Sequence, residues 1–218
     1  MIIRTLFCVS ITFAQWSSDP GAPQLLGTGI QPQTAGTSDG GVYIAWLKDG
    51  NYHVYIQRID AAGETQFDGS GMLVSDNENS SWIAVYHLNL TVDNDDNAIV
   101  TTVDERTGVW EVYAWKIAPD GSMLWGQDGL ALTTSGVTNM SPRMTILPDN
   151  SVVVTCTHGN GTVLFQRISP DGELLWGDGI LIETDNGSLV SPQPIVSVSG
   201  DVLVQWIRQT GSPPYYDS

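Results

Sequence analysis

One phrase of sequence occurs three times in this chain of 218 residues. In each copy an isoleucine opens a short turn that ends in glycine, and an aromatic residue follows the glycine by four positions: Ile59–Phe67, Ile117–Trp125 and Ile168–Trp176. The copies start 58 and then 51 residues apart. A fixed period of roughly this size indicates one supersecondary unit used repeatedly. The sequence therefore predicts an array of similar units.

The third unit shows the internal order of a unit most clearly. Its β-branched and apolar runs predict four strands, separated by Pro/Asp/Gly turns: 142–147, 152–156, 162–168 and a fourth that begins at 173–176 and is followed by 177–179 and 180–182. The second of these runs is apolar enough to be buried on both faces. Four antiparallel strands in about 50 residues form a β-propeller blade.

We therefore expect an all-β fold, a β-propeller of four-stranded antiparallel blades. The units predicted from the repeat are 31–74, 88–132, 141–183 and 191–218. This gives about three complete blades plus part of a fourth, an incomplete ring, because closed propellers have ~4–8 blades. We expect residues 15–218 to be the N-terminal part of a longer protein whose remaining blades follow Ser218.

Residues 1–14 have the pattern of a secretory signal peptide. Arg4 precedes the apolar run 6–13, and Ala14 offers a small residue for cleavage. A wrongly assigned start or a buried first strand is the alternative. No later stretch approaches the ~18 apolar residues of a membrane span, so we expect no transmembrane segment. The expected location is secreted or on the outer cell surface.

The charge balance excludes one large class of partner. The chain has 24 Asp and Glu against 8 Lys and Arg, a formal net charge of −16. Such a surface repels phosphate backbones, and no basic stripe is present, so nucleic-acid binding is not expected.

Cleavage after Ala14 leaves Cys156 as the one cysteine, which excludes a framework of intrachain disulfides. When the units are aligned, Cys156 falls in register with Trp46, Thr102 and Trp206. A slot that holds tryptophan in two other units is a packing position. We therefore expect Cys156 to be buried and to have a packing role, in preference to a reactive or pairing thiol.

Two further sets of residues recur at fixed places in the units. The first is the glycine and aromatic pair of each repeat, namely Gly63 with Phe67, Gly121 with Trp125, and Gly172 with Trp176. The second is a cation near the end of each third strand: Arg58, Lys116 and Arg167. Repetition in every unit favours a structural role. For the cations we expect pairing with a nearby acid or coverage of an aromatic ring.

The segment Arg167–Trp176 resembles two known propeller repeats. Its glycine four residues before a tryptophan is similar to the tryptophan-docking repeat of the pyrroloquinoline-quinone-like propellers, and the likeness extends over about residues 40–182. In that family the tryptophan packs between neighbouring blades. The segment also resembles the sialidase Asp-box through Ser169, Asp171 and Trp176, although Gly172 stands one place early. The processing site 13–16 is similar to that of exported surface proteins of Bacteroidetes.

These resemblances imply enzymatic activities, but the chain lacks the catalytic and cofactor-binding motifs on which those activities depend. The quinoprotein dehydrogenases commonly use a vicinal cysteine pair beside the cofactor, and no Cys-Cys occurs here. Sialidases use three arginines around the substrate carboxylate, and Arg106, Arg143 and Arg208 lie in no matching motif. No cofactor is therefore expected.

One acidic cluster imitates a calcium loop. Asp93, Asp95 and Asn97 place oxygen ligands at alternate positions, and Asp104 follows Asp93 by eleven residues. The sixth position is Ala98 instead of the glycine on which such loops turn. A plain turn between strands is the favoured interpretation, and calcium is the alternative.

No residue is assigned a catalytic role. The three histidines lie in different units without zinc-ligand spacing, and nucleophile and phosphate-loop motifs are absent. We expect a non-catalytic module for binding a protein or glycan ligand, or for scaffolding. The loops after the second strands (48–52, 106–109, 158–161 and 208–214) share one face, and either face is a candidate. The alternative is a fragment of a sialidase-like or quinoprotein-like enzyme.

Overall fold

The computed structural model describes residues 21, 23–77, 79 and 88–211. Its strands fall into four antiparallel sheets, which we call blades 1 to 4 in chain order. Blade 1 contains β1 (Ile30–Gly36), β2 (Val42–Leu47), β3 (Val54–Ile59) and β4 (Met72–Ser75). Blade 2 contains β5 (Asn89–Val92), β6 (Ala98–Asp104), β7 (Glu111–Ile117) and β8 (Leu130–Ala131). Blade 3 contains β9 (Asn139–Ile146), β10 (Val152–His158), β11 (Thr162–Ile168) and β12 (Ile180–Ile182). Blade 4 contains β13 (Ser188–Val196) and β14 (Val202–Gln209).

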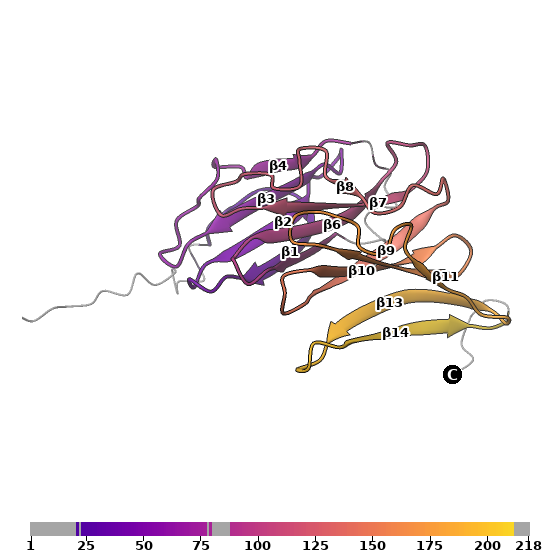
Figure 1. The fold of residues 1–218 in the computed structure, drawn as a ribbon. Coiled ribbons are helices and arrows are strands. Elements are labelled where there is room, and N and C mark those ends of the chain that lie inside the picture. The colour runs from indigo at the N-terminus through magenta and orange to yellow at the C-terminus, as the bar shows by residue number, and fades with distance from the viewer. Residues whose placement is uncertain (1–20, 22, 78, 80–87, 212–218) are drawn as a thin grey trace, which may run out of the picture.

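Each complete blade is a simple meander, with neighbouring strands joined in chain order. The first strands of successive blades contact one another: β1 lies against β5, β5 against β9, and β9 against β13. Figure 1 shows the sheets following one another from indigo to yellow, with β13 and β14 at the far edge. Stacked four-stranded meanders whose first strands face a common centre form a β-propeller. The expected all-β propeller of three blades and part of a fourth is confirmed.

The core lies in the central strands of the blades. Every residue of β6 and β7 is buried, and so is every residue of β10 except the last. These strands are rich in Val, Ile and Thr, whose branched side chains pack well on a pleated sheet. Because both faces of a central strand are covered by neighbouring blades, β6 and β7 are buried throughout instead of alternating between buried and exposed residues.

The predicted start of the fourth strand at 173–176 is wrong. Leu174 forms only an isolated bridge to Ile168, and the fourth strand is β12, further along the chain. Between the Leu174 bridge and β12, the chain is bonded to the side chain of Gln166. Its Oε1 accepts from the amide of Trp176 at 3.2 Å, and its Nε2 donates to the Gly177 carbonyl at 2.8 Å. A side chain thus satisfies backbone groups that a strand would otherwise pair.

A β-bulge recurs in the first strands and was not predicted. Gln31, Ser141 and Ser191 all have positive φ near 50°, and each precedes a proline. The carbonyl of Pro142 accepts a hydrogen bond from Asn89 of blade 2, and that of Pro192 accepts one from Thr155 of blade 3. The bulges therefore turn backbone acceptors toward the preceding blade.

The expected signal peptide, residues 1–14, lies outside the described residues. Among those that are described, no helix is long and apolar enough to cross a membrane.

Candidate ligand-binding site between the second and third blades

The repeated glycine and aromatic residues meet across the boundaries between blades. The Trp125 side chain of blade 2 is only 6% exposed, and its Nε1 donates to the Pro170 carbonyl of blade 3 at 3.1 Å. A Cβ added to Gly172 would lie 2.9 Å from the Trp125 ring, so glycine is required there for the ring to fit. Gly121 lies in the same way over Phe67 of blade 1. Each aromatic residue therefore docks beneath the turn of the next blade.

The other two members of this set occupy the ends of the array. Gly63 has positive φ and forms the corresponding turn of blade 1. Trp176 of blade 3 is partly exposed. It has no turn above it among the described residues, because the described part of blade 4 ends before the place where that turn would form.

The three repeated cations each pair with a carboxylate in the turn between the first and second strands of the same blade. The ion pairs are Arg58 with Asp39 at 2.5 Å, Lys116 with Asp93 at 2.9 Å, and Arg167 with Asp149 at 2.7 Å. Arg58 also lies over the Tyr43 ring, 5.7 Å from its centroid. The pairs differ greatly in exposure, since both side chains of the second pair are buried and Asp149 is open to solvent.

The structure does not bring all four proposed calcium ligands together, because Asp104 lies apart from Asp93, Asp95 and Asn97. Strand β6 separates Asp93 from Asp104, and its seven residues span roughly 20 Å at a rise of about 3.3 Å each. Asp104 pairs with Arg106, and Asp95 accepts from the side chain of Asn150. Asn97 donates to Asp93. No group of three or more His, Cys, Asp and Glu among the described residues could hold a metal ion. Calcium binding remains a prediction of the sequence.

Cys156 is fully buried in the centre of β10. Burial, with a smaller contribution from the negative charge of Glu111, raises the pKa of its thiol to about 12. A thiol with so high a pKa holds almost no thiolate at neutral pH, so Cys156 is unreactive in the folded protein.

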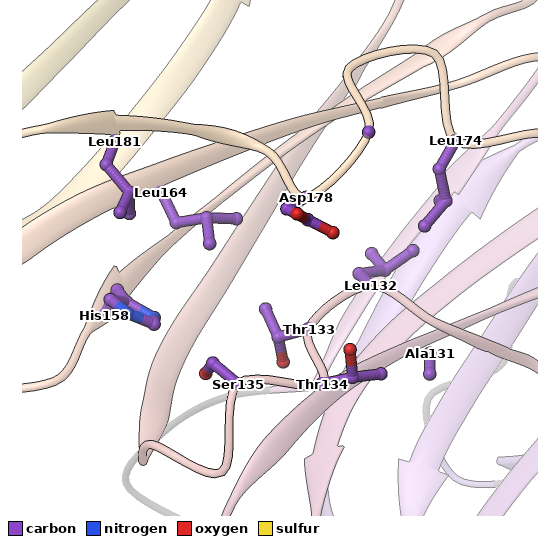
Figure 2. A pocket seen from close by; sticks show the side chains of 11 residues that line it. Ala131, Leu132, Thr133, Thr134, Ser135, His158, Leu164, Leu174, Asp178 and Leu181 are labelled. Atoms are coloured by element: carbon purple, nitrogen blue, oxygen red, sulfur yellow. The ribbon is translucent and has the colours of Figure 1, made fainter.

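A pocket of about 410 Å³ lies between blades 2 and 3 and extends from His158, at the end of β10, along the connection between β11 and β12. One wall is the segment 131–135 that leaves blade 2, and the opposite wall contains His158 and Leu164 of blade 3. The loop between β11 and β12 adds Leu174 and Asp178. Figure 2 shows these side chains around a common space, with the carboxylate of Asp178 on the side of the β11–β12 loop. The lining is thus apolar at several points and carries hydroxyl, imidazole and carboxylate groups at others.

A buried polar network lies next to this pocket and includes Thr133 of its lining. Glu111, at the start of β7, is 1% exposed. Its carboxylate accepts hydrogen bonds from the Thr133 hydroxyl, from the amide of Gly136 at 3.0 Å and from the side chain of Asn139 at 3.0 Å. Three donors compensate for the cost of burying the carboxylate. Because Glu111 belongs to blade 2 and Asn139 to blade 3, the network fixes one blade against the other.

The same network orients His158. Asn139 Nδ2 donates to Glu111 and to the Val137 carbonyl, so Asn139 Oδ1 is the acceptor toward His158 Nδ1 at 2.7 Å. The Nδ1 atom therefore carries the proton, and in the neutral ring Nε2 keeps a lone pair for another partner. The pocket thus presents an imidazole acceptor whose orientation is set by the protein.

No protein-family model matches the chain, and no curated protein matches it. Among solved structures, the chain is similar to a protein from Lactobacillus plantarum, with 14% identity over 85% of this chain and 50% of that one and a TM-score of 0.49. An endo-1,4-beta-xylanase from Bacteroides thetaiotaomicron matches with 9% identity over 84% and 68% of the two chains and a TM-score of 0.48. A putative TolB from Agrobacterium tumefaciens matches with 14% identity over 84% and 61%, with a TM-score of 0.45.

The chain therefore spans half of the Lactobacillus structure and less than two thirds of the TolB structure. All of these TM-scores are below 0.5. The propeller assignment accordingly rests on the sheets and their order.

The sequence did not predict the pocket or the network behind it. Glu111, Asn139 and Thr133 come from different elements and belong to no motif. One signal was present: a glutamate opens the apolar run of β7, and β7 is buried throughout. A buried acid needs donors, and the hydroxyl and amide groups at 133–139 supply them.

Proposed function

We propose that the protein is a secreted or cell-surface binding module, and that the pocket between blades 2 and 3 takes a hydroxyl-rich ligand of the glycan class. The observation that carries this proposal is the chain of hydrogen bonds from Glu111 through Asn139 to His158, which orients the imidazole ring at the wall of the pocket. A preorganised acceptor does not have to be ordered when the ligand binds, and this favours affinity.

The mixed lining fits the chemistry of a sugar. A sugar ring has apolar C–H faces that can lie against Leu164 and Leu174, while its hydroxyl groups can donate to His158 Nε2 and to the Asp178 carboxylate. Each residue that lines the pocket is neutral apart from Asp178 and, when protonated, His158. A ligand with several hydroxyl groups and little charge suits this lining better than an anion does.

Binding without catalysis is supported by the surroundings of Asp178 and Glu111, two acidic residues near the pocket. Acid–base hydrolysis of a glycosidic bond needs two carboxyl groups free to act on the substrate. Among the described residues, Asp178 is the one carboxylate that lines the pocket, and the oxygens of Glu111 are occupied by three donors. The sialidase-like or quinoprotein-like enzyme remains a prediction of the sequence.

Location and repeat type belong to the same proposal. The signal-like residues 1–14 and the net charge of −16 support an exported protein. The docking of Trp125 beneath the Pro170 turn supports a repeat of the tryptophan-docking type.

A glycan array with the labelled full chain, followed by calorimetry with the strongest ligand, tests the binding proposal. We expect saturable binding that weakens about tenfold or more in His158→Gln and in Asp178→Asn, since each loses a hydrogen bond to the ligand. The matched control is His53→Gln, which changes a histidine in the corresponding hairpin of blade 1 and should bind normally. No saturable binding to any glycan, or equal binding by His158→Gln and the wild type, would contradict the proposal.

A further inference from the structure

We propose that the free edge of β14 is a docking site for a β-hairpin of this chain's own repeat type, which carries a Lys or Arg opposite Leu203. Three independent features of the described residues indicate this occupant: an uncovered strand, an acid without an ion pair and a tryptophan without a turn above it.

The first feature is the exposure of β14. In blades 1 to 3 the residues in register with Leu203 are Tyr43, Ile99 and Val153, and all three are completely buried. Leu203 itself is 61% exposed. Among the described residues β14 pairs only with β13, whereas the second strand of every other blade pairs on both sides. Such an edge presents unpaired backbone groups to an incoming strand.

A groove lies on the same sheet. It has a volume of about 400 Å³ and is lined by residues of β13 and β14 that include Ile195 and Leu203. Ile207, which is 57% exposed, lies on the same face of β14 as Leu203, and Trp206, which is 40% exposed, lies on the opposite face.

The second feature is the place of Asp201. In blades 1 to 3, the second-strand residue equivalent to Leu203 pairs with a residue of the third strand. That third-strand residue is always the repeated cation: Arg58, Lys116 or Arg167. In blade 3 this cation reaches back to the turn before the second strand, where Arg167 Nε donates to Ser151 Oγ at 2.9 Å. Asp201 stands at the place of Ser151 and forms no ion pair with any described residue. A carboxylate there favours a cation opposite Leu203.

The third feature is Trp176. Its counterpart Trp125 is covered by the turn that joins the third and fourth strands of blade 3. A hairpin added to β14 would bring the corresponding turn over Trp176. One occupant therefore pairs the edge, neutralises Asp201 and covers the indole.

The occupant is a hairpin of this type and not a second copy of the chain. In each copy the described hairpins with the required pattern already belong to blades 1 to 3. Two copies would also bring together two net charges of −16, which oppose association.

The probe for the test is a synthetic peptide with the sequence of residues 54–75, added to the full chain. It reproduces the hairpin of β3 and β4, carries Arg58, and contains no tryptophan. We expect saturable binding with a blue shift of tryptophan emission, because the Trp176 indole leaves water. The Trp176→Phe protein should bind the peptide without that shift.

Charge reversal provides the sharper control. Asp201→Lys in the protein, or Arg58→Glu in the peptide, should each weaken binding about tenfold or more, and the two changes together should restore it. Asp201 is exposed, so the substitution spares the core. Absence of binding at high peptide concentration, failure of the double reversal to restore binding, or a dimer of the chain alone in sedimentation would each overturn the proposal.

Discussion

Strands β6 and β14 hold the same place in their blades but differ completely in their surroundings. Both are second strands, both pair with a first strand, and both are rich in aliphatic residues. Every residue of β6 is buried, whereas most of β14 is exposed. Blade 2 lies between two complete blades, and beyond blade 4 the described residues place nothing.

The difference shows that a blade of this kind is not stabilised by its own sheet alone. Each of blades 1 to 3 has all four of its strands paired in order, but the burial of apolar side chains depends on contact with the next blade. In repeat proteins, stability is approximately the sum of a term for each unit and a term for each interface. The docking of Trp125, the turn contacts and the Glu111 network all belong to the interface terms.

The largest expected effect separates two tryptophans at equivalent positions. Trp125→Ala should lower the free energy of unfolding by about 3–5 kcal/mol, because it removes a buried indole between blades 2 and 3. Trp176→Ala should cost less than half as much, because that indole is partly exposed. Denaturant unfolding of both variants measures the difference. Equal losses would remove the distinction between the inner boundary and the edge.

The ion pairs provide a second contrast. Lys116→Met leaves Asp93 buried without its cation and should lower the free energy of unfolding by about 3–5 kcal/mol. This loss should not exceed that of Trp125→Ala. The matched change Arg167→Met breaks a pair whose carboxylate is exposed, and should cost about 1 kcal/mol or less. If thermal unfolding gave the same loss for both, burial would not be the property that decides the strength of the repeated pair.

Acid should act on the same buried pair. Burial opposes ionisation of Asp93, but hydrogen bonds from Asn97 and Lys116 outweigh it and hold the pKa of the carboxyl below its ordinary value of 3.8. A depressed pKa in the folded state means that this stabilisation is complete above pH ~4 and is lost as the pH falls through the folded pKa. In unfolding measured from pH 6 to pH 2, Asp93→Asn should flatten the acid limb. An unchanged limb would contradict this assignment.

The smallest expected effect concerns the turns. The Asn150 side chain accepts from the Asn94 amide at 3.0 Å and donates to Asp95 at 2.8 Å, which joins the turn of blade 3 to that of blade 2. Asn150→Gly keeps the positive φ of 63° without strain and removes both bonds. A loss of about 0.5–1.5 kcal/mol is expected in thermal unfolding. A loss above about 3 kcal/mol would place the coupling of the blades in the turns instead of the indoles.

The sequence was sufficient for the parts of the fold that repeat. The register that aligned Cys156 with Trp46 and Trp206 is the register of the strand pairing, and β11 has the predicted bounds. The start of the fourth strand was placed too early because 173–176 has the apolar composition of a strand. The Trp176 amide and the Gly177 carbonyl are instead bonded to the side chain of Gln166, and composition does not reveal such a contact.

The candidate site lay beyond the reach of pattern reasoning for a related reason. Its polar groups occur once, at a single boundary between blades, so no repetition marks them. The chain from Glu111 to His158 depends on how blade 3 stacks on blade 2, and it becomes visible only when both blades are placed. The repeat therefore predicts the scaffold, and the departures from the repeat provide the site.

Hydrogen exchange of the intact chain tests most directly whether neighbouring blades supply the stability. The account predicts the slowest amide exchange in β6, β7 and β10, whose residues are covered by a blade on each side, and much faster exchange in β14. It also predicts that Trp125→Ala accelerates exchange on both sides of the boundary between blades 2 and 3. Protection in β14 equal to that in β10, or a Trp125→Ala effect confined to blade 2, would contradict the account.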